Sequence, residues 1–221
     1  MIIYHDNMIA VCVKPAGVPS SDEPGGMPEL IEKALGLPLK TVKTVHRLDT
    51  AVSGLMVYAL TKEAAAVLSR EITEGTFQKT YLAAVHGRPD DPAGRFTDLL
   101  FKDSKANKTY VVKRPRKGVR EAVLDYEMIG AENDLSLIKV RLLTGRTHQI
   151  RVQFSSRKMP LYGDRKYGAP EAGAGFGLWS YALSFDHPKT GEHMEFTKLP
   201  PTDLPWRYFD LKFTAPNDSP D

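Results

Sequence analysis

The stretch TVHRLDTAVSGLMVYALTK, residues 44–62, places a charged segment directly before an unbroken apolar run. The apolar run at 55–60 predicts a buried strand. Arg47 and Asp49 precede this strand, and a Ser-Gly pair at 53–54 marks a turn between them and the strand. The charged residues are either a solvated loop pair, or the acid is held at the start of the strand to perform chemistry.

Most of the remaining chain has the residue pattern of strands. Strands are predicted in MIAVCVKPAGVP (8–19), TYLAAVHG (80–87), EAVLDYEMIG (121–130) and LSLIKVRLL (135–143). A hairpin is predicted in LSFDHPKTGEHMEF (183–196), with Lys-Thr-Gly in its turn.

Helices are fewer. MPELIEKAL (27–35) has a proline near its start and a glycine just after its end, and Thr61 can cap KEAAAVLSREITE (62–74). THQIRVQFSSR (147–157) fits a strand or a helix, and we favour a helix with Thr147 as its N-cap. Because strands outnumber helices and do not alternate with them, we expect an α+β fold. It is built on a largely antiparallel or mixed central sheet with flanking helices.

The length of 221 residues is compatible with one large domain or two small ones. The segment RPDDPAG (88–94) is a possible division between two lobes, but there is no long structureless linker. We therefore expect one domain over residues 1–213 and a frayed tail at 214–221.

Several classes of protein are excluded by composition. The single Cys12 cannot form an internal disulfide, and there is no CxxC or HExxH motif, so neither a metal nor a cofactor is expected. His5 and Asp6 interrupt the region where a signal peptide needs an apolar core, and the apolar runs are far shorter than the roughly 18 residues of a membrane span. A cytoplasmic protein without a membrane partner is expected.

The net charge of +3 hides a strong segregation. Residues 102–120 hold eight Lys and Arg against one Asp, and residues 139–166 hold another eight against Asp164 alone. The rest of the chain then carries 14 basic and 25 acidic residues. Two basic segments in an otherwise acidic chain indicate a polyanionic partner, although two solvated faces would give the same counts.

Asp49 is the leading candidate for chemistry. A carboxylate taken out of water stays ionised only where cations or hydrogen-bond donors replace its hydration. LLTGRTHQIRVQ (142–153) supplies Arg146 and Arg151, and either guanidinium is suited to gripping a carboxylate or a phosphate. His148 is expected to make a structural hydrogen bond rather than to transfer a proton. Tyr81 is either a core aromatic or a ring that stacks on a nucleobase.

VHRLDTAVSGLMVYAL (45–60) resembles the catalytic motif of the RluA family of RNA pseudouridine synthases. Five further stretches resemble other motifs of that family, in its order: IAVCVKPAGVPS (9–20), FQKTYLAAVHG (77–87), LLTGRTHQIRVQF (142–154), MPLYGDRKYG (159–168) and LSFDHPKTGEHMEF (183–196). The resemblance covers about residues 2–201, nearly the whole chain. No N-terminal S4-type RNA-binding domain is expected.

The resemblance implies the pseudouridine synthase fold, with a catalytic cleft. It also implies isomerisation of uridine to pseudouridine in RNA, in a stem–loop of ribosomal or transfer RNA. It makes Asp49 the essential carboxylate, Tyr81 the active-site aromatic and Arg151 the partner of Asp49. Arg47 would occupy the gap left by the extruded nucleotide. Other expected RNA contacts are His46, Arg146, His148, Lys113, Arg114, Arg116 and Lys117. No cofactor and no obligatory protein partner is implied, and we expect a monomer.

Three positions depart from the family pattern: Tyr181 replaces a frequent His, Val52 a usual Thr and Leu124 a common Thr. None carries chemistry, but Tyr181 leaves the identity of the RNA open. One alternative is a catalytically inactive RNA-binding relative, which loss of Asp49 or Arg151 would favour, and both are present. A carboxylate-based glycosidase needs two acids flanking the scissile bond, and no second acid accompanies Asp49 in its motif.

Overall fold

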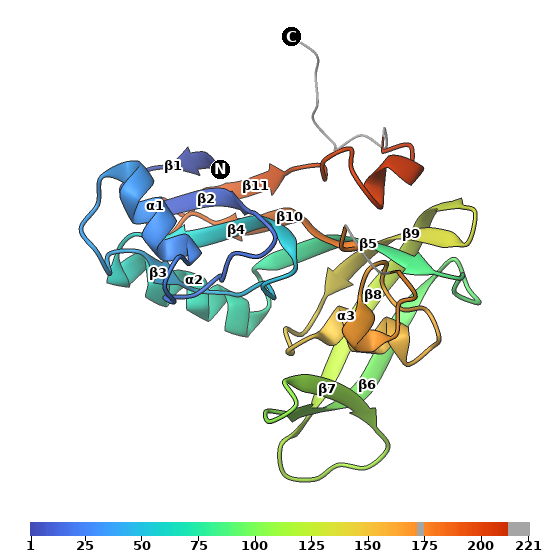
Figure 1. Cartoon of the computed structure of the whole chain (residues 1–221). Coiled ribbons are helices and arrows are strands. Elements are labelled where there is room, and N and C mark those ends of the chain that lie inside the picture. The colour runs from blue at the N-terminus through green and yellow to red at the C-terminus, as the bar shows by residue number, and fades with distance from the viewer. Residues whose placement is uncertain (172–174, 212–221) are drawn as a thin grey trace. The chain divides into compact units, whose positions relative to one another are not determined.

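The computed structural model describes residues 1–171 and 175–211 (Figure 1). The described residues form three α-helices, eleven strands and two short 3-10 helices. They divide into two compact units, the first of residues 1–80 and 179–198 and the second of residues 81–178 with the described part of 199–221. The α+β expectation is confirmed, whereas the tail at 214–221 lies outside the described residues.

The first unit is built on a mixed sheet. Its strands β1 (Ile2–His5), β2 (Ile9–Lys14), β4 (Ser53–Ala59) and β10 (Leu178–Asp186) are hydrogen-bonded in that order. The short β3 (Lys43–Thr44) pairs with β4, and β11 (His193–Thr197) pairs with β10 as the expected hairpin. β10 is parallel to β4 and β2 is antiparallel to it, so the sheet is mixed.

Two helices accompany this sheet. α1 (Met27–Leu35) has Pro28 in its first turn and ends at Gly36 in the left-handed conformation, as predicted. α2 (Lys62–Glu74) begins at Thr61, whose Oγ1 accepts the amide of Ala64 at 3.1 Å. Its apolar side joins a core with the strands, made of residues such as Val11, Leu55, Val57, Leu68, Phe77 and Phe185.

The sheet of the second unit has the strand order β5 (Gln78–His86), β9 (Leu135–Leu142), β8 (Val119–Glu132), β6 (Ala93–Asp103) and β7 (Lys108–Val112). From β9 to β7, each strand is antiparallel to the next. Side chains alternate along β8, with Leu124 and Tyr126 buried and Asp125 on the opposite face. The rings of Tyr126, Phe96 and Phe154 pack together and attach α3 (Gln149–Ser155) to one face of the sheet. The segment 88–94 lies inside this unit and does not divide the two units.

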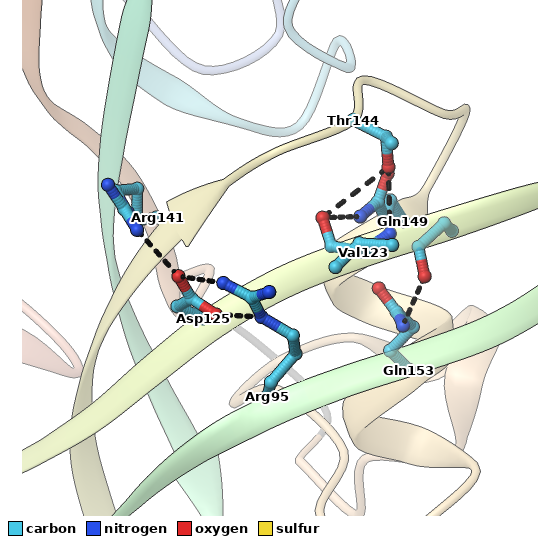
Figure 2. Close-up of polar contacts among 8 residues, drawn as sticks. Arg95, Val123, Asp125, Arg141, Thr144, Gln149 and Gln153 are labelled. Carbon is cyan, nitrogen blue, oxygen red and sulfur yellow. Dashed lines mark hydrogen bonds and ion pairs between the residues drawn. The ribbon is translucent and has the colours of Figure 1, made fainter.

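The start of α3 is fixed by a side chain that we did not predict (Figure 2). The Oε1 atom of Gln149 accepts hydrogen bonds from Thr144 Oγ1 at 2.8 Å and from the amide of Arg146 at 3.0 Å. The amide nitrogen of the same side chain donates to the Val123 carbonyl at 3.1 Å. The prediction of a helix was correct, but Thr147 as its N-cap was wrong. The N-cap is His148, at φ +54°, and the Gln149 side chain satisfies the loop instead.

The face of the second unit opposite α3 carries a charged row across three strands (Figure 2). Asp125 accepts two bonds from Arg95, at 2.6 and 3.0 Å, and one from Arg141 at 2.7 Å. The hydrogen bonds from Arg95, together with those from Arg141, lower the pKa of the Asp125 carboxyl to about 2. Both arginines are more than half exposed, so water screens the pair and its contribution to stability is small.

Gly54 allows the start of β4 to approach β10 closely. Its φ is +120°, and a Cβ atom there would lie 2.4 Å from the carbonyl oxygen of Ser180. Gly17 also has a positive φ of +83°, but a Cβ atom there would meet nothing within 4 Å.

The two glycines form a matched pair for mutation. We expect Gly17→Ala to cost about 1–2 kcal/mol of unfolding free energy through its backbone conformation alone. Gly54→Ala adds a backbone clash and should cost about 3 kcal/mol or more. Urea denaturation of both variants measures the difference, and equal losses would show that β10 moves aside at little cost.

Candidate active site

The loop that carries Asp49 connects β3 to β4 and is anchored by buried polar groups. Ser20 Oγ donates to the Leu48 carbonyl at 2.7 Å and accepts the Leu48 amide at 3.1 Å. The hydroxyl of Tyr58 donates to the Ser20 carbonyl at 2.8 Å, and the Val52 amide donates to the Asp49 carbonyl at 2.9 Å. The backbone on both sides of Asp49 is therefore fixed before any substrate binds.

A buried amine lies beneath the same loop. The Nζ atom of Lys14 donates to the carbonyls of Val18 at 2.7 Å, Pro15 at 2.9 Å and Thr50 at 3.1 Å. Burial lowers the pKa of Lys14 to about 8, against the opposing effect of the Asp49 charge. At neutral pH the amine is mainly protonated, so it attracts the neighbouring carboxylate. We did not predict this residue, although a lysine that ends an apolar strand directly before a proline was a usable signal.

His46 and Arg47 differ in exposure. His46 is buried, and its Nε2 accepts the Val57 amide at 3.2 Å. Burial, with a smaller effect of the Lys79 charge, lowers the pKa of His46 to about 3, so the imidazole is neutral. Arg47 is exposed and Asp49 is half-buried. The observed hydrogen bond of His46 is structural, and its contact with RNA stays a prediction.

Arg151 lies on α3 in the second unit, and its side chain is only 7% exposed. Its guanidinium makes a two-pronged contact with Asp164, from Nε at 2.6 Å and from Nη2 at 2.8 Å. The Cζ atom lies 5.0 Å from the centre of the Tyr167 ring and 5.3 Å from that of Phe176. Asp49 belongs to the other unit, so its pairing with Arg151 stays a prediction.

The other predicted residues of the second unit occupy different environments. Tyr81 is 5% exposed at the start of this unit. His148 is buried, with its Nδ1 atom 2.9 Å from the hydroxyl of Tyr167, which is the structural hydrogen bond expected for it. Arg146 is exposed and donates to the Glu121 carbonyl at 2.9 Å. Tyr181, in β10 of the first unit, is also buried.

The basic segment 102–120 runs from the end of β6 through β7 and a loop into β8 (Figure 1). In that loop Arg116 lies over the ring of Phe101 at 4.6 Å. At the start of β7, Lys108 lies over the rings of Tyr110 and Tyr167, at 5.7 and 5.2 Å, and borders an open groove of about 240 Å³ between β7 and α3. The four predicted RNA-binding residues of the loop are all exposed: Lys113, Arg114, Arg116 and Lys117.

A family model described as RNA pseudouridylate synthase matches residues 8–156. This chain belongs to that family. The enzyme is therefore an RNA pseudouridine synthase, which is an isomerase, and the match spans the Lys14 strand, the Asp49 loop, the basic segment and α3.

Relatives of this RNA pseudouridine synthase agree with the family model. The present chain is 34% identical over 208 residues to the dual-specificity RNA pseudouridine synthase RluA of Escherichia coli K12, and the match covers 89% of this chain and 91% of that protein. It is 31% identical over 214 residues to the uncharacterized RNA pseudouridine synthase YlyB of Bacillus subtilis, covering 92% of this chain and 70% of that protein.

Solved structures confirm the fold. Human RNA pseudouridylate synthase domain containing 1 is similar with a TM-score of 0.76 and 23% identity, over 92% of this chain and 84% of that one. Human RNA pseudouridylate synthase domain containing 4 gives a TM-score of 0.74 and 23% identity, over 90% and 88% of the two chains. None of the helices in the described ranges has both the length and the apolar character needed to cross a bilayer.

The burial of His46 leads to a prediction about how the free energy of unfolding changes with pH. The pKa of histidine is 6.5 in the unfolded chain but about 3 in the folded one, so the unfolded state binds more protons between these values. The contribution of His46 to the free energy of unfolding is therefore fully present above pH 6.5. It is lost as the pH falls from 6.5 toward 3, by up to about 1.4 kcal/mol per pH unit.

His46→Gln keeps an acceptor for the Val57 amide and removes the titration. We expect the slope of unfolding free energy against pH, between about pH 4 and 6, to become shallower by about 1.4 kcal/mol per unit. Urea denaturation at several pH values measures it, with the exposed His5→Gln as control. Parallel curves for wild type and His46→Gln would contradict the assignment.

Proposed function

We propose that this enzyme isomerises a specific uridine in a stem–loop of ribosomal or transfer RNA, with Asp49 as its essential residue. The observation that carries the proposal is the anchored loop, which fixes the backbone of a half-buried acid next to an exposed arginine. The name of the E. coli relative, a dual-specificity enzyme, supports including both kinds of RNA.

The reaction is an isomerisation, in which one carbon–nitrogen bond is replaced by one carbon–carbon bond and no atom is gained or lost overall. The bond from ribose C1′ to N1 of uracil breaks, the base rotates, and C1′ bonds to C5. The proton on C5 leaves and N1 gains one. Asp49 acts at C1′, either by addition or by promoting elimination, and Tyr81 stacks on the uracil and assists removal of the C5 proton. Arg151 pairs with Asp49 and fixes the direction of its carboxylate.

Access to the target requires extrusion of the nucleotide, at a cost of a few kcal/mol. Arg47 is suited to fill the vacated position in the stack, because it is exposed two residues before Asp49 and its guanidinium is planar. The exposed cations of the basic segment would bind the flanking phosphates and offset part of the cost.

Asp49→Asn tests the central residue. We expect it to abolish turnover while RNA affinity stays within a few-fold, because the amide keeps the shape but lacks the charge and the nucleophilic oxygen. Tritium release from RNA labelled at C5 of uridine measures turnover, and filter binding measures affinity. The control is Asp22→Asn, which changes an exposed acid in the same unit.

Turnover by Asp49→Asn above background would overturn the proposal. A wild type that binds RNA and releases no tritium from ribosomal or transfer RNA would favour the inactive RNA-binding alternative. Mapping pseudouridines across total RNA from cells with and without the gene would identify the target.

Changing Lys113, Arg114, Arg116 and Lys117 together to Gln tests the basic segment. If these residues bind phosphates, the slope of log affinity against log salt should become shallower by about 3. The matched control removes the same charge from the first unit by changing the exposed Lys33, Lys40, Lys62 and Arg70 to Gln. An unchanged slope in the first variant would place the segment away from the RNA.

A further inference from the structure

We propose that the segment GDRKYG, residues 163–168, is an orienting clamp for Arg151, in which Asp164 is a positioning residue for the isomerisation. The inference rests on the proposed role of Arg151. It assigns a task to a motif to which the proposed reaction gives no role.

The contact between Asp164 and Arg151 fixes the direction of the guanidinium. A guanidinium offers two edges that grip a carboxylate with two hydrogen bonds, one formed by Nε with Nη2 and the other by Nη1 with Nη2. Asp164 uses the first edge, with its two oxygens 2.6 Å from Nε and 2.8 Å from Nη2. Two bonds to one carboxylate prevent rotation of the group, so the direction of the second edge is set. A second carboxylate, as proposed for Asp49, would have to use that second edge.

The surroundings make the clamp rigid. Side-chain exposure is 7% for Arg151 and 1% for Asp164, so water does not compete for their bonds. The rings of Tyr167 and Phe176 lie 5.0 and 5.3 Å from the Arg151 Cζ atom, within cation–π range. An exposed arginine would sample many rotamers, whereas this one is held in a single geometry by one acid and two rings.

The remaining residues of the motif hold the clamp in place. Gly163 has φ +72°, and a Cβ atom there would lie 2.2 Å from the carbonyl oxygen of Gly175, so only glycine fits. Tyr167 is fixed at both ends. Its hydroxyl accepts the Thr109 amide at 2.8 Å, and its carbonyl accepts Ser155 Oγ at 2.6 Å. These contacts connect the motif to β7 on one side and to the end of α3 on the other.

The experiment compares Asp164→Asn with Thr61→Ala in the full chain. Asp164→Asn weakens the two-pronged grip, so Arg151 can turn. A misplacement of about 1 Å in an active site costs roughly 100-fold in rate, so we expect kcat to fall by about that factor while KM stays within about threefold. Thr61→Ala removes the side-chain cap of α2 in the first unit, so it should lower Tm with kcat within about threefold of wild type. It is therefore the control for loss of stability alone. Turnover is measured well below the Tm of each variant.

A double-mutant cycle then separates positioning from an independent role. If Asp164 acts through Arg151, Asp164→Asn should change the residual kcat of Arg151→Met by less than about twofold. A further fall as large as in wild type would overturn the inference, as would wild-type kcat in folded Asp164→Asn. If Asp164→Asn does not fold, Asp164→Glu keeps the charge and displaces it by one methylene. A folded Asp164→Glu with wild-type kcat would equally overturn the proposal, whereas a fall in kcat at unchanged KM would support it.

Asp49→Asn is assayed alongside. Turnover by that variant would refute the proposed function. An inactive Asp49→Asn together with a fully active Asp164→Asn would refute the clamp alone.

Discussion

The candidate site depends most on the hydrogen bonds between the buried ammonium of Lys14 and the backbone around it. Placing a charge in the interior is unfavourable unless polar groups replace its hydration, and three backbone carbonyls do so here. One of them belongs to Thr50, the residue after Asp49. The loop is thus shaped by the need to satisfy a buried cation. The acid it carries has a defined position without a regular helix or strand to support it.

The second unit also buries a charged group, but side chains rather than backbone carbonyls stabilise it. A buried guanidinium is matched by the buried carboxylate of Asp164, and Gln149 satisfies the turn before α3 with its own amide group. Breaking a buried pair on one side is costly, about 3–5 kcal/mol, because the remaining charge keeps its burial and loses its partner. Geometry and stability are therefore coupled in this unit, which is why the proposed assay needs a control that loses stability without moving Arg151.

Much of the fold could be predicted from local patterns, because strands and helices with clear periodicity follow from the side chains they bury. Both ends of α1 followed from a proline and a glycine, and the start of α2 followed from a threonine cap. The start of α3 did not, because a side chain within the helix, Gln149, made the bonds that a cap usually makes. Motif resemblance identified the family. The partners of Lys14 and Arg151 could not be predicted, since Lys14–Thr50 and Arg151–Asp164 are contacts between segments separated in the chain.

The position of β7 has a consequence for association between copies of the protein. β7 ends the strand order of the second unit, and an end strand is where another polypeptide can extend a sheet, although the Tyr167 hydroxyl already bonds the backbone of Thr109 here. Lys108 lies in this strand, and Lys113 and Arg114 follow it directly. Like charges on two such edges repel each other, so the cations proposed to hold RNA also disfavour edge-to-edge pairing between copies. Replacing them for any purpose would remove a safeguard against aggregation along with the proposed binding surface.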